Sequence, residues 1–129
     1  MGTAVVIVED SEQFVLRLKA AVNEVPGLAL AGSAATPAEA IELVFTARPA
    51  IVILDLFLIG GSGVEVLRAI KEQRLDTQVI VVTNAPSKAL SDSCRDLGAR
   101  FFFDKALEFD QFQEVLRTLP ARSASIQAR

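Results

Sequence analysis

Histidine is absent from this sequence of 129 residues. Its absence excludes Ser-His-Asp catalysis, Cys-His catalysis and zinc sites that use histidine. Cys94 is the only cysteine, so an internal disulfide is excluded and a reducing cytoplasm is the expected location. The longest apolar runs, such as 4–8 and 79–82, are far too short to cross a bilayer. No basic start followed by an apolar stretch predicts a secretion signal.

Runs of lysine or arginine are also lacking, and the formal net charge is −3. We therefore expect no direct binding to nucleic acid. Hydrophobic residues make up 51% of the chain and charged residues 22%, which predicts a globular protein with one core. We expect one domain over residues 1–120 and a short, flexible tail over 121–129. No output domain follows Leu119, which leaves a stand-alone domain and a piece of a longer protein as alternatives.

Five short apolar runs predict strands that are buried inside a sheet. The most regular is Ile51–Leu54, an unbroken apolar run that leads directly into Asp55. The other runs cover residues 3–8, 28–31, 78–82 and 101–103. Their brevity and apolar character are typical of parallel strands covered on both faces.

Segments with helical spacing of apolar residues lie between and after these runs. Two helix starts are marked by capping boxes, Thr36 with Glu39 and Ser62 with Glu65, and Pro37 follows the first cap. The predicted helices begin near residues 11, 37, 62, 86 and 109, and four of them end at Pro26-Gly27, Pro49, Gly98 and Pro120. Five strands alternating with five helices predict an α/β domain with a parallel sheet and right-handed crossovers.

Polar side chains stand where the strong predicted strands end. Glu9 and Asp10 follow the first strand, Asp55 follows the third, and Thr83 and Lys105 lie at the ends of the last two. Because the carboxyl ends of parallel strands share one edge of the sheet, these side chains should converge. Three crowded carboxylates favour a hard cation such as Mg²⁺. The hydroxyl and the ammonium supply donors for a phosphoryl group, which an aspartate can accept as an acyl phosphate.

In order along the chain, these motifs resemble the receiver domain of bacterial two-component response regulators. The resemblance covers Thr3 to about Leu119, and the residues that carry it are Glu9-Asp10, Asp55, the loop to Gly63, Thr83 and Phe103-Asp104-Lys105. It implies a flavodoxin-like (βα)5 three-layer sandwich whose parallel five-stranded sheet has the order 2-1-3-4-5. The glycines at 60–63 lack the lysine ending of a phosphate-binding loop, so we interpret them as turn glycines.

The resemblance also implies a role for each site residue. Asp55 would accept the phosphoryl group, Thr83 would bond one of its oxygens and Lys105 would pair with it. Mg²⁺ would be bound by four residues, which are Glu9, Asp10, Asp55 and, through its backbone carbonyl, Phe57. The protein would be a phosphoacceptor that catalyses its own phosphoryl transfer and slow dephosphorylation, and it would not be a classical enzyme.

Thr83 and Phe102 would form the switch that the phosphoryl group operates. The surface altered by this switch would comprise the fourth helix, the fifth strand and the fifth helix. A histidine kinase or a histidine phosphotransfer protein would be the donor. The output would be a partner protein or a second receiver domain bound through that surface.

Four positions depart from the family pattern. Ala106 stands where proline is usual, Asn84 where a small residue is usual, Ile59-Gly60 in place of Pro-Gly, and Phe102 in place of tyrosine. Ala106 puts the conformation of the turn after the lysine in question, and Asn84 is expected to crowd the site. The acidic pair, the acceptor, the threonine and the lysine are all retained.

Two alternative functions stay open beside the phosphorylated switch. The first is a small phosphohydrolase with an aspartate nucleophile, a class that usually has a second aspartate two residues after the first. That position is Phe57 in this chain. The second is an interaction domain that is never phosphorylated, although such domains typically lose residues that are retained here.

Overall fold

Five parallel strands form one sheet in the computed structural model, which describes residues 2–84 and 86–127, with side chains described as far as Pro120. The strand order is β2-β1-β3-β6-β7. Their bounds are Thr3–Val8 for β1, Leu28–Ala34 for β2, Ile51–Leu54 for β3, Gln78–Thr83 for β6 and Phe101–Asp104 for β7. This is the order 2-1-3-4-5 along the chain, so the predicted flavodoxin-like sheet is confirmed.

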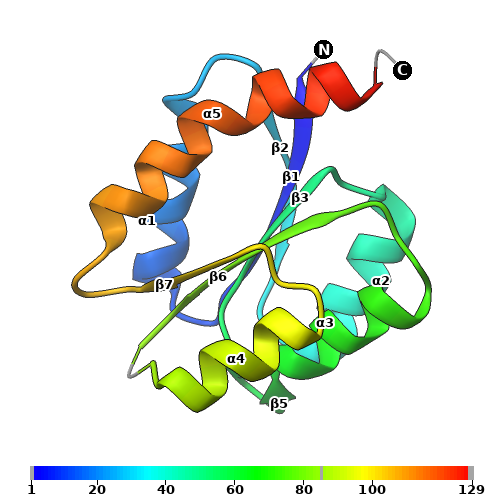
Figure 1. The fold of residues 1–129 in the computed structure, drawn as a ribbon, viewed down its shortest axis with the longest axis vertical. Helices are drawn as coiled ribbons and strands as arrows, with labels where there is room; N and C mark the ends of the chain where they lie inside the picture. The colour runs from blue at the N-terminus through cyan, green and yellow to red at the C-terminus, as the bar shows by residue number, and fades with distance from the viewer. Residues whose placement is uncertain (1, 85, 128–129) are drawn as a thin grey trace.

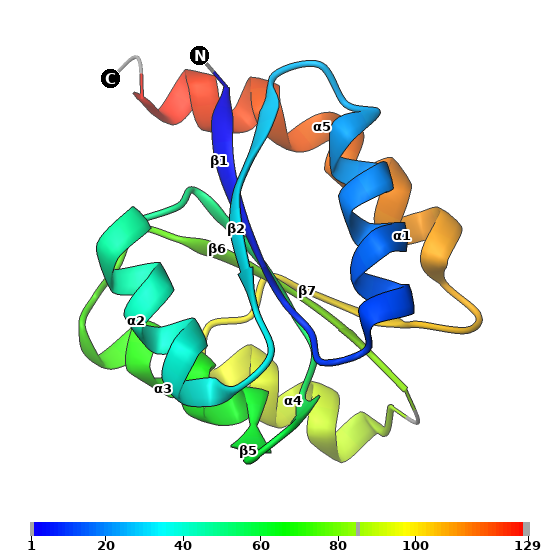
Figure 2. The same ribbon diagram turned by 180° about the vertical axis from the view of Figure 1, so that it is seen from behind.

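Helices cover both faces of the sheet and complete the three layers (Figures 1 and 2). The helices α1 and α5 lie on one face, and α2, α3 and α4 lie on the other. Their bounds are Glu12–Asn23 for α1, Pro37–Ala47 for α2, Gly63–Glu72 for α3, Lys88–Asp96 for α4 and Phe109–Gln127 for α5. Among the described residues, no helix combines the length and the apolar character that crossing a bilayer requires.

The position of β3 at the centre of the sheet explains why its sequence is apolar throughout. Ile51 and Ile53 pack into the core beneath α1 and α5, whereas Val52 and Leu54 pack into the core beneath α2, α3 and α4. Successive side chains of a strand point to opposite faces, so a strand covered on both sides needs apolar residues at every position. Asp55 is the first polar residue after this run.

The register between strands brings together the polar residues that follow the ends of the strands. Val8 pairs with Leu54, and the Asp55 amide donates to the Val8 carbonyl at 2.9 Å. The prediction that β2 ends at residue 31 is wrong, because β2 continues to Ala34, which pairs with Val8. The residues that directly follow β1 and β3 are therefore neighbours at one edge of the sheet.

The helix starts agree in part with the predicted caps. Thr36 Oγ1 accepts a hydrogen bond from the Glu39 amide at 3.2 Å, as expected. The box predicted between Ser62 and Glu65 does not form, because Ser62 Oγ accepts from the Val64 amide instead, at 3.1 Å. The fourth helix begins two residues later than predicted, because Ser87 caps it.

The predicted end of the last helix at Pro120 is wrong, because α5 continues to Gln127 with Pro120 inside it. A proline removes one amide hydrogen from a helix, but the helix can continue beyond it with a kink. Pro120 also packs against the turn before β2, since a Cβ added to Gly27 would lie 3.2 Å from Pro120 Cβ. The flexibility predicted for 121–129 stays a prediction, and residues 128–129 lie outside the described part of the chain.

A short hairpin that the sequence analysis did not predict follows Asp55. Its strands are β4 at Phe57–Leu58 and β5 at Gly61–Ser62, and they pair antiparallel. Gly60 forms the turn with a φ of 80°, a conformation that glycine adopts without steric cost. The interpretation of these residues as turn glycines is therefore confirmed for Gly60 only, because Gly61 lies in β5 and Gly63 begins α3.

Gly63 allows the start of α3 to lie directly against the chain after β3. A Cβ at this position would overlap the Asp55 carbonyl oxygen and lie 3.0 Å from Leu56 Cα. We expect Gly63→Ala to lower the free energy of unfolding by about 3 kcal/mol, because backbone must move to admit the methyl group. Urea denaturation measures this loss.

Gly60→Ala is the matched control. No atom lies within 4 Å of a Cβ added at Gly60, so this variant meets only the cost of a positive φ, about 1 kcal/mol. Equal losses in the two variants would contradict the steric explanation for Gly63.

Candidate functional site

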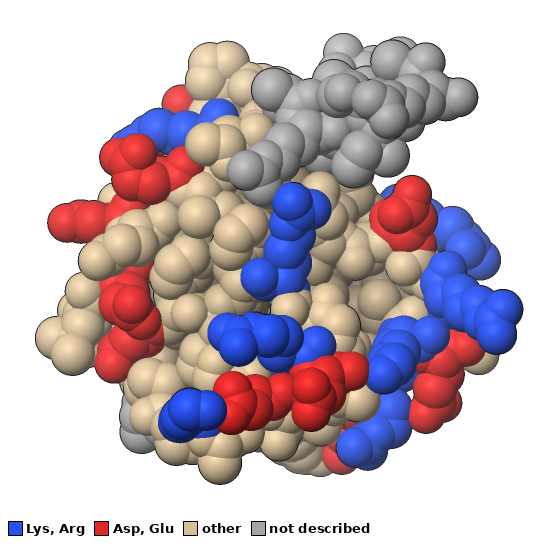
Figure 3. Space-filling model, viewed as in Figure 1, with Lys and Arg blue, Asp and Glu red and all other residues tan. Residues whose placement is uncertain are grey.

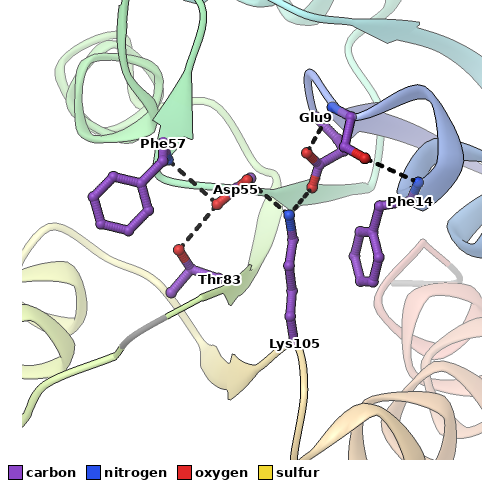
Figure 4. Close-up of polar contacts among 7 residues, drawn as sticks. Glu9, Phe14, Asp55, Phe57, Thr83 and Lys105 are labelled. Atoms are coloured by element: carbon purple, nitrogen blue, oxygen red, sulfur yellow. Dashed lines mark hydrogen bonds and ion pairs between the residues drawn. The ribbon is translucent and has the colours of Figure 1, made fainter.

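Residues at the carboxyl ends of four strands, or directly after them, meet at one edge of the sheet, as the sequence predicts. Glu9, Asp55, Thr83 and Lys105 are buried, with exposed fractions of 2%, 5%, 0% and 8%. Figure 4 shows Lys105 reaching between Asp55 and Glu9, while Thr83 lies on the other side of Asp55. Charged groups this deeply buried need partners, and the partners are one another.

Each oxygen of the Asp55 carboxylate accepts a hydrogen bond. Thr83 Oγ1 donates to Asp55 Oδ1 at 2.9 Å, and the Phe57 amide donates to the same oxygen at 3.3 Å. Lys105 Nζ donates to Asp55 Oδ2 at 3.0 Å. A hydroxyl and an ammonium thus already surround the carboxylate, in positions from which they can serve an anion attached to it.

The Lys105 ammonium is enclosed on several sides. It lies 2.6 Å from Glu9 Oε1 and 4.4 Å from the centre of the Phe14 ring. Burial alone would lower the pKa of Lys105, but the hydrogen bonds and charges of Glu9 and Asp55 outweigh it, and the pKa is raised. Lys105 is therefore a cation at neutral pH.

Opposing effects act on the pKa of Glu9. Burial raises the pKa of Glu9, although the contact with Lys105 and the Ser11 amide act in the opposite direction. The Ser11 amide donates to Oε2 at 3.0 Å. Oε1 is also buried and forms a close ion pair with Lys105 Nζ at 2.6 Å.

The acidic residues are suitably arranged for a metal ion. Glu9, Asp10 and Asp55 can each offer a carboxylate oxygen, and these oxygens lie within 4.8 Å of one another. Lys105 supplies one positive charge against three carboxylates. This excess of negative charge, carried by carboxylate oxygens, fits a hard divalent cation with oxygen ligands.

Two residues with predicted roles lie at the margin of this cluster. Phe57 extends an exposed side chain, 56% accessible, and Figure 4 shows it on the Thr83 side of Asp55. Phe102 is half-buried and packs against the core beneath α2, α3 and α4. Asn84 is exposed and lines a cavity together with Lys105 and Ala106, and the crowding expected from it stays a prediction.

Sequence reasoning missed the part that Phe14 plays at the site. Its spacing placed it on the apolar face of α1, where it is indeed buried, but its ring also contacts the Lys105 ammonium. Arg17 stacks on the other aromatic of this corner, with Cζ 4.2 Å from the centre of the Phe109 ring. A signal for these contacts is lacking in the sequence, because they join segments far apart in the chain.

A cavity of about 600 Å³ opens next to the acidic residues. Glu9, Asp10 and Glu39 contribute acidic groups to its lining. Leu16 and Ile59 also line it and are 66% and 61% exposed. The cavity beside Glu9 and Asp10 is therefore lined by both acidic and apolar side chains.

Comparison with known proteins agrees with this geometry. Residues 5–117 match the family described as the response regulator receiver domain. The acid tolerance regulatory protein ActR of Rhizobium meliloti is 33% identical over 117 residues, which are 91% of this chain and 59% of ActR. Sporulation initiation phosphotransferase F of Bacillus subtilis is 29% identical over 91 residues, covering 70% of this chain and 73% of that relative.

Solved structures give the same result. The signal receiver domain of a protein described as a Luxo repressor from Vibrio parahaemolyticus is 26% identical, with a TM-score of 0.87 over 99% of this chain and 96% of that one. The CheX-CheY-BeF3-Mg²⁺ complex from Borrelia burgdorferi matches with 25% identity, a TM-score of 0.75 and 87% coverage of each chain.

This chain belongs to the response regulator receiver domain family of two-component systems. Its acidic cluster of Glu9, Asp10 and Asp55 is consistent with a phosphoacceptor site and is typical of Mg²⁺ sites in receiver domains. Such a domain is typically a phosphoacceptor and not a classical enzyme. The chain spans 59% of the length of ActR and 55% of the C4-dicarboxylate response regulator DctR of Bacillus subtilis.

Proposed function

We propose that this chain is a phosphorylation-controlled switch that accepts a phosphoryl group on Asp55. One observation carries the proposal: the buried Asp55 carboxylate is contacted by both the Thr83 hydroxyl and the Lys105 ammonium, beside two further carboxylates. Phosphoryl transfer needs little beyond such positioning and charge stabilisation.

The proposed reaction uses Asp55 as the nucleophile. A carboxylate oxygen of Asp55 forms a bond to the phosphorus of a phosphohistidine, while the bond from phosphorus to the imidazole nitrogen breaks. The electron pair of that bond returns to the imidazole, and the product on Asp55 is an acyl phosphate. Thr83 and Lys105 then transfer their hydrogen bonds from the carboxylate to phosphoryl oxygens.

The proposed cofactor is Mg²⁺. Carboxylate oxygens of Glu9, Asp10 and Asp55 would hold it, together with the backbone carbonyl of Phe57. When bound, Mg²⁺ neutralises negative charge on the carboxylates and on the phosphoryl oxygens. The work of orienting the phosphoryl group falls to Thr83 and Lys105.

The proposed donor is a histidine kinase or a histidine phosphotransfer protein. This chain contains no histidine, so the phosphohistidine lies outside the given sequence. The cavity beside Asp10, with Leu16 and Ile59 exposed on its rim, supports contact with a protein. Exposed apolar side chains at the mouth of a reaction site are typical of such contacts.

Intact mass spectrometry tests the proposal directly. The full chain is incubated with acetyl phosphate, once with Mg²⁺ and once with Mg²⁺ and excess EDTA. We expect a mass gain of one phosphoryl group with Mg²⁺ and no gain with EDTA. An unchanged mass in both samples would favour an interaction domain that is never phosphorylated, and release of phosphate at many turnovers per minute would favour a phosphohydrolase.

The proposed output surface comprises α4, β7 and α5. Thr83 pairs with Asp104 across β6 and β7, and Phe102 lies two residues before Asp104 on the same strand. Drawing Thr83 toward a phosphoryl group would open space that the Phe102 ring can fill. Figure 3 shows acidic side chains gathered over the margin formed by α1 and the start of α5, and charges of both signs over α4. A partner protein or a second receiver domain would bind to the α4, β7 and α5 surface.

Hydrogen–deuterium exchange checks the output surface. On phosphorylation we expect amide exchange to change within residues 88–113, because the switch residues adjoin these elements. The region of α1 and α2 serves as the internal comparison. Changes confined to α1 and α2 would contradict the proposed surface.

We expect the phosphorylated form to last minutes or longer without a phosphatase. Hydrolysis needs a water in line with the Asp55–phosphorus bond, and Phe57, two residues beyond the acceptor, supplies bulk without a hydrogen bond. Ala85, two residues beyond Thr83, cannot orient a water, but it lies outside the described residues. Phe57→Asn should speed the release of phosphate roughly tenfold, the effect of about 1.4 kcal/mol in the barrier. Decay of the wild type within seconds, or an unchanged rate in the variant, would contradict this role.

A further inference from the structure

The turn that follows β7 is held by the side chain of Asp104, the residue directly before Lys105. Asp104 Oδ1 accepts hydrogen bonds from the amide of Ala106 at 2.8 Å and from the amide of Leu107 at 3.2 Å. The Asp104 amide donates to Glu108 Oε1 at 2.9 Å, and the Glu108 amide donates to the Asp104 carbonyl at 2.9 Å. These contacts close residues 104–108 into one hydrogen-bonded turn.

Lys105 lies inside this closed turn. Its own amide donates to the Thr83 carbonyl at 3.0 Å, which ties the same stretch of backbone to β6. The side chain leaves this fixed backbone and places its ammonium against Asp55 and Glu9. A lysine side chain has a long, flexible stem, so the position of its ammonium depends strongly on where its backbone is held.

The amide of Ala106 is one of the two donors to the Asp104 carboxylate. The side chain of Ala106 is exposed, but its amide forms the shorter of the two bonds to the Asp104 carboxylate. A proline at this position would lack that hydrogen. The turn is therefore fixed by a side chain that accepts hydrogen bonds from the backbone, as in other Asx turns.

We propose that Asp104 is a positioning residue for phosphoryl transfer to Asp55. Its carboxylate fixes the turn from which Lys105 reaches the reacting group, while Asp104 itself does not touch that group. This inference rests on the proposed function of Asp55. It extends that function by assigning control of the lysine to a residue outside the cluster of buried charges.

The test measures how fast the full chain gains mass with acetyl phosphate and Mg²⁺. We expect Asp104→Ala to lower the rate of mass gain about fivefold. The variant loses the two hydrogen bonds from the amides of Ala106 and Leu107, which hold the backbone next to Lys105. Asp104→Asn should restore most of the rate, since its side-chain oxygen still accepts from both amides. Asp110→Ala is the matched control, because Asp110 is an exposed acid on α5 outside the turn, and its rate should equal that of the wild type.

A double-mutant cycle separates positioning from a general loss of stability. In the background of Lys105→Met, we expect Asp104→Ala to cause no further slowing, because the residue that it positions has been removed. A further loss equal to that in the wild-type background would overturn the inference. The affinity of each variant for beryllium fluoride in the presence of Mg²⁺ provides a second measurement of the same cycle. This measurement applies even to a variant whose phosphoryl transfer is too slow to follow.

The two proposals fail in different ways. A wild type that gains no mass contradicts the proposed function of Asp55. A wild type that gains mass at the same rate as Asp104→Ala leaves that function intact and overturns only the role of Asp104.

Discussion

Asp55→Asn is expected to abolish the phosphorylation of this chain. The substituted side chain has nearly the same shape and keeps an oxygen that can accept from Thr83, but it lacks the anionic oxygen that attacks phosphorus. We expect the rate of mass gain with acetyl phosphate and Mg²⁺ to fall at least about 100-fold. The fold should persist, because the change removes one of several negative charges crowded around Lys105.

Asp76→Asn is the control for this substitution. Asp76 is exposed and precedes β6, at the opposite edge of the sheet from Asp55. Its variant should gain mass at the wild-type rate. Peptide mapping of the modified wild type gives an independent readout, since the added mass should lie on the peptide that contains Asp55. Labelling that survives Asp55→Asn would remove Asp55 as the acceptor.

Lys105→Met is expected to cause a large loss of stability. The variant keeps most of the side chain's volume but leaves Glu9 and Asp55, which are 2% and 5% exposed, without their cation. Removing one partner from a buried ion pair costs about 3–5 kcal/mol, because the remaining charge is uncompensated. Urea denaturation at pH 7 without Mg²⁺ measures the loss.

The size of this loss should depend on pH. Burial raises the pKa of Glu9 above its ordinary value of 4.5, and the contact with Lys105 opposes that rise. Without Lys105 the folded-state pKa should rise further above the unfolded value. The folded variant then binds more protons than the unfolded chain, so its stability falls as the pH rises from about 4.5 toward neutrality. We therefore expect a smaller deficit near pH 5 than at pH 7.

Lys88→Met provides the matched control. Lys88 pairs with Asp92 at 2.8 Å, but these side chains are 89% and 47% exposed. Solvent screens such a pair, so its removal should cost less than about 1 kcal/mol. Similar losses for Lys105→Met and Lys88→Met would show that the buried charges of the site are not held by Lys105.

Several parts of the fold could be predicted because they depend on short stretches of chain. The unbroken apolar run at Ile51–Leu54 indicated a strand covered on both faces, and the structure buries all four residues. Thr36 with Pro37 indicated where a helix begins, and α2 begins there. In both cases, the residues that fix the element lie within or next to it.

Other parts could not be predicted because they depend on contacts between distant segments. In the sequence Pro120 indicates a helix end, yet it lies inside α5 and packs near Gly27, more than ninety residues earlier. The absence of a side chain at Gly63 matters because the backbone of Asp55 lies against it. The position of Phe14 beside Lys105 likewise depends on how α1 packs next to the end of β7.

The sequence by itself determined which residues end the strands and hence which chemical groups meet at the carboxyl edge. That inference needs only the alternation of strands and helices and the parallel direction of the strands. The tertiary structure alone decided how these groups are paired: Lys105 between Glu9 and Asp55, Thr83 on the opposite oxygen of Asp55, and Asp104 holding the turn. Pairings of this kind depend on distances of about 3 Å between segments far apart in the chain, and these distances are set by the packing of the whole domain.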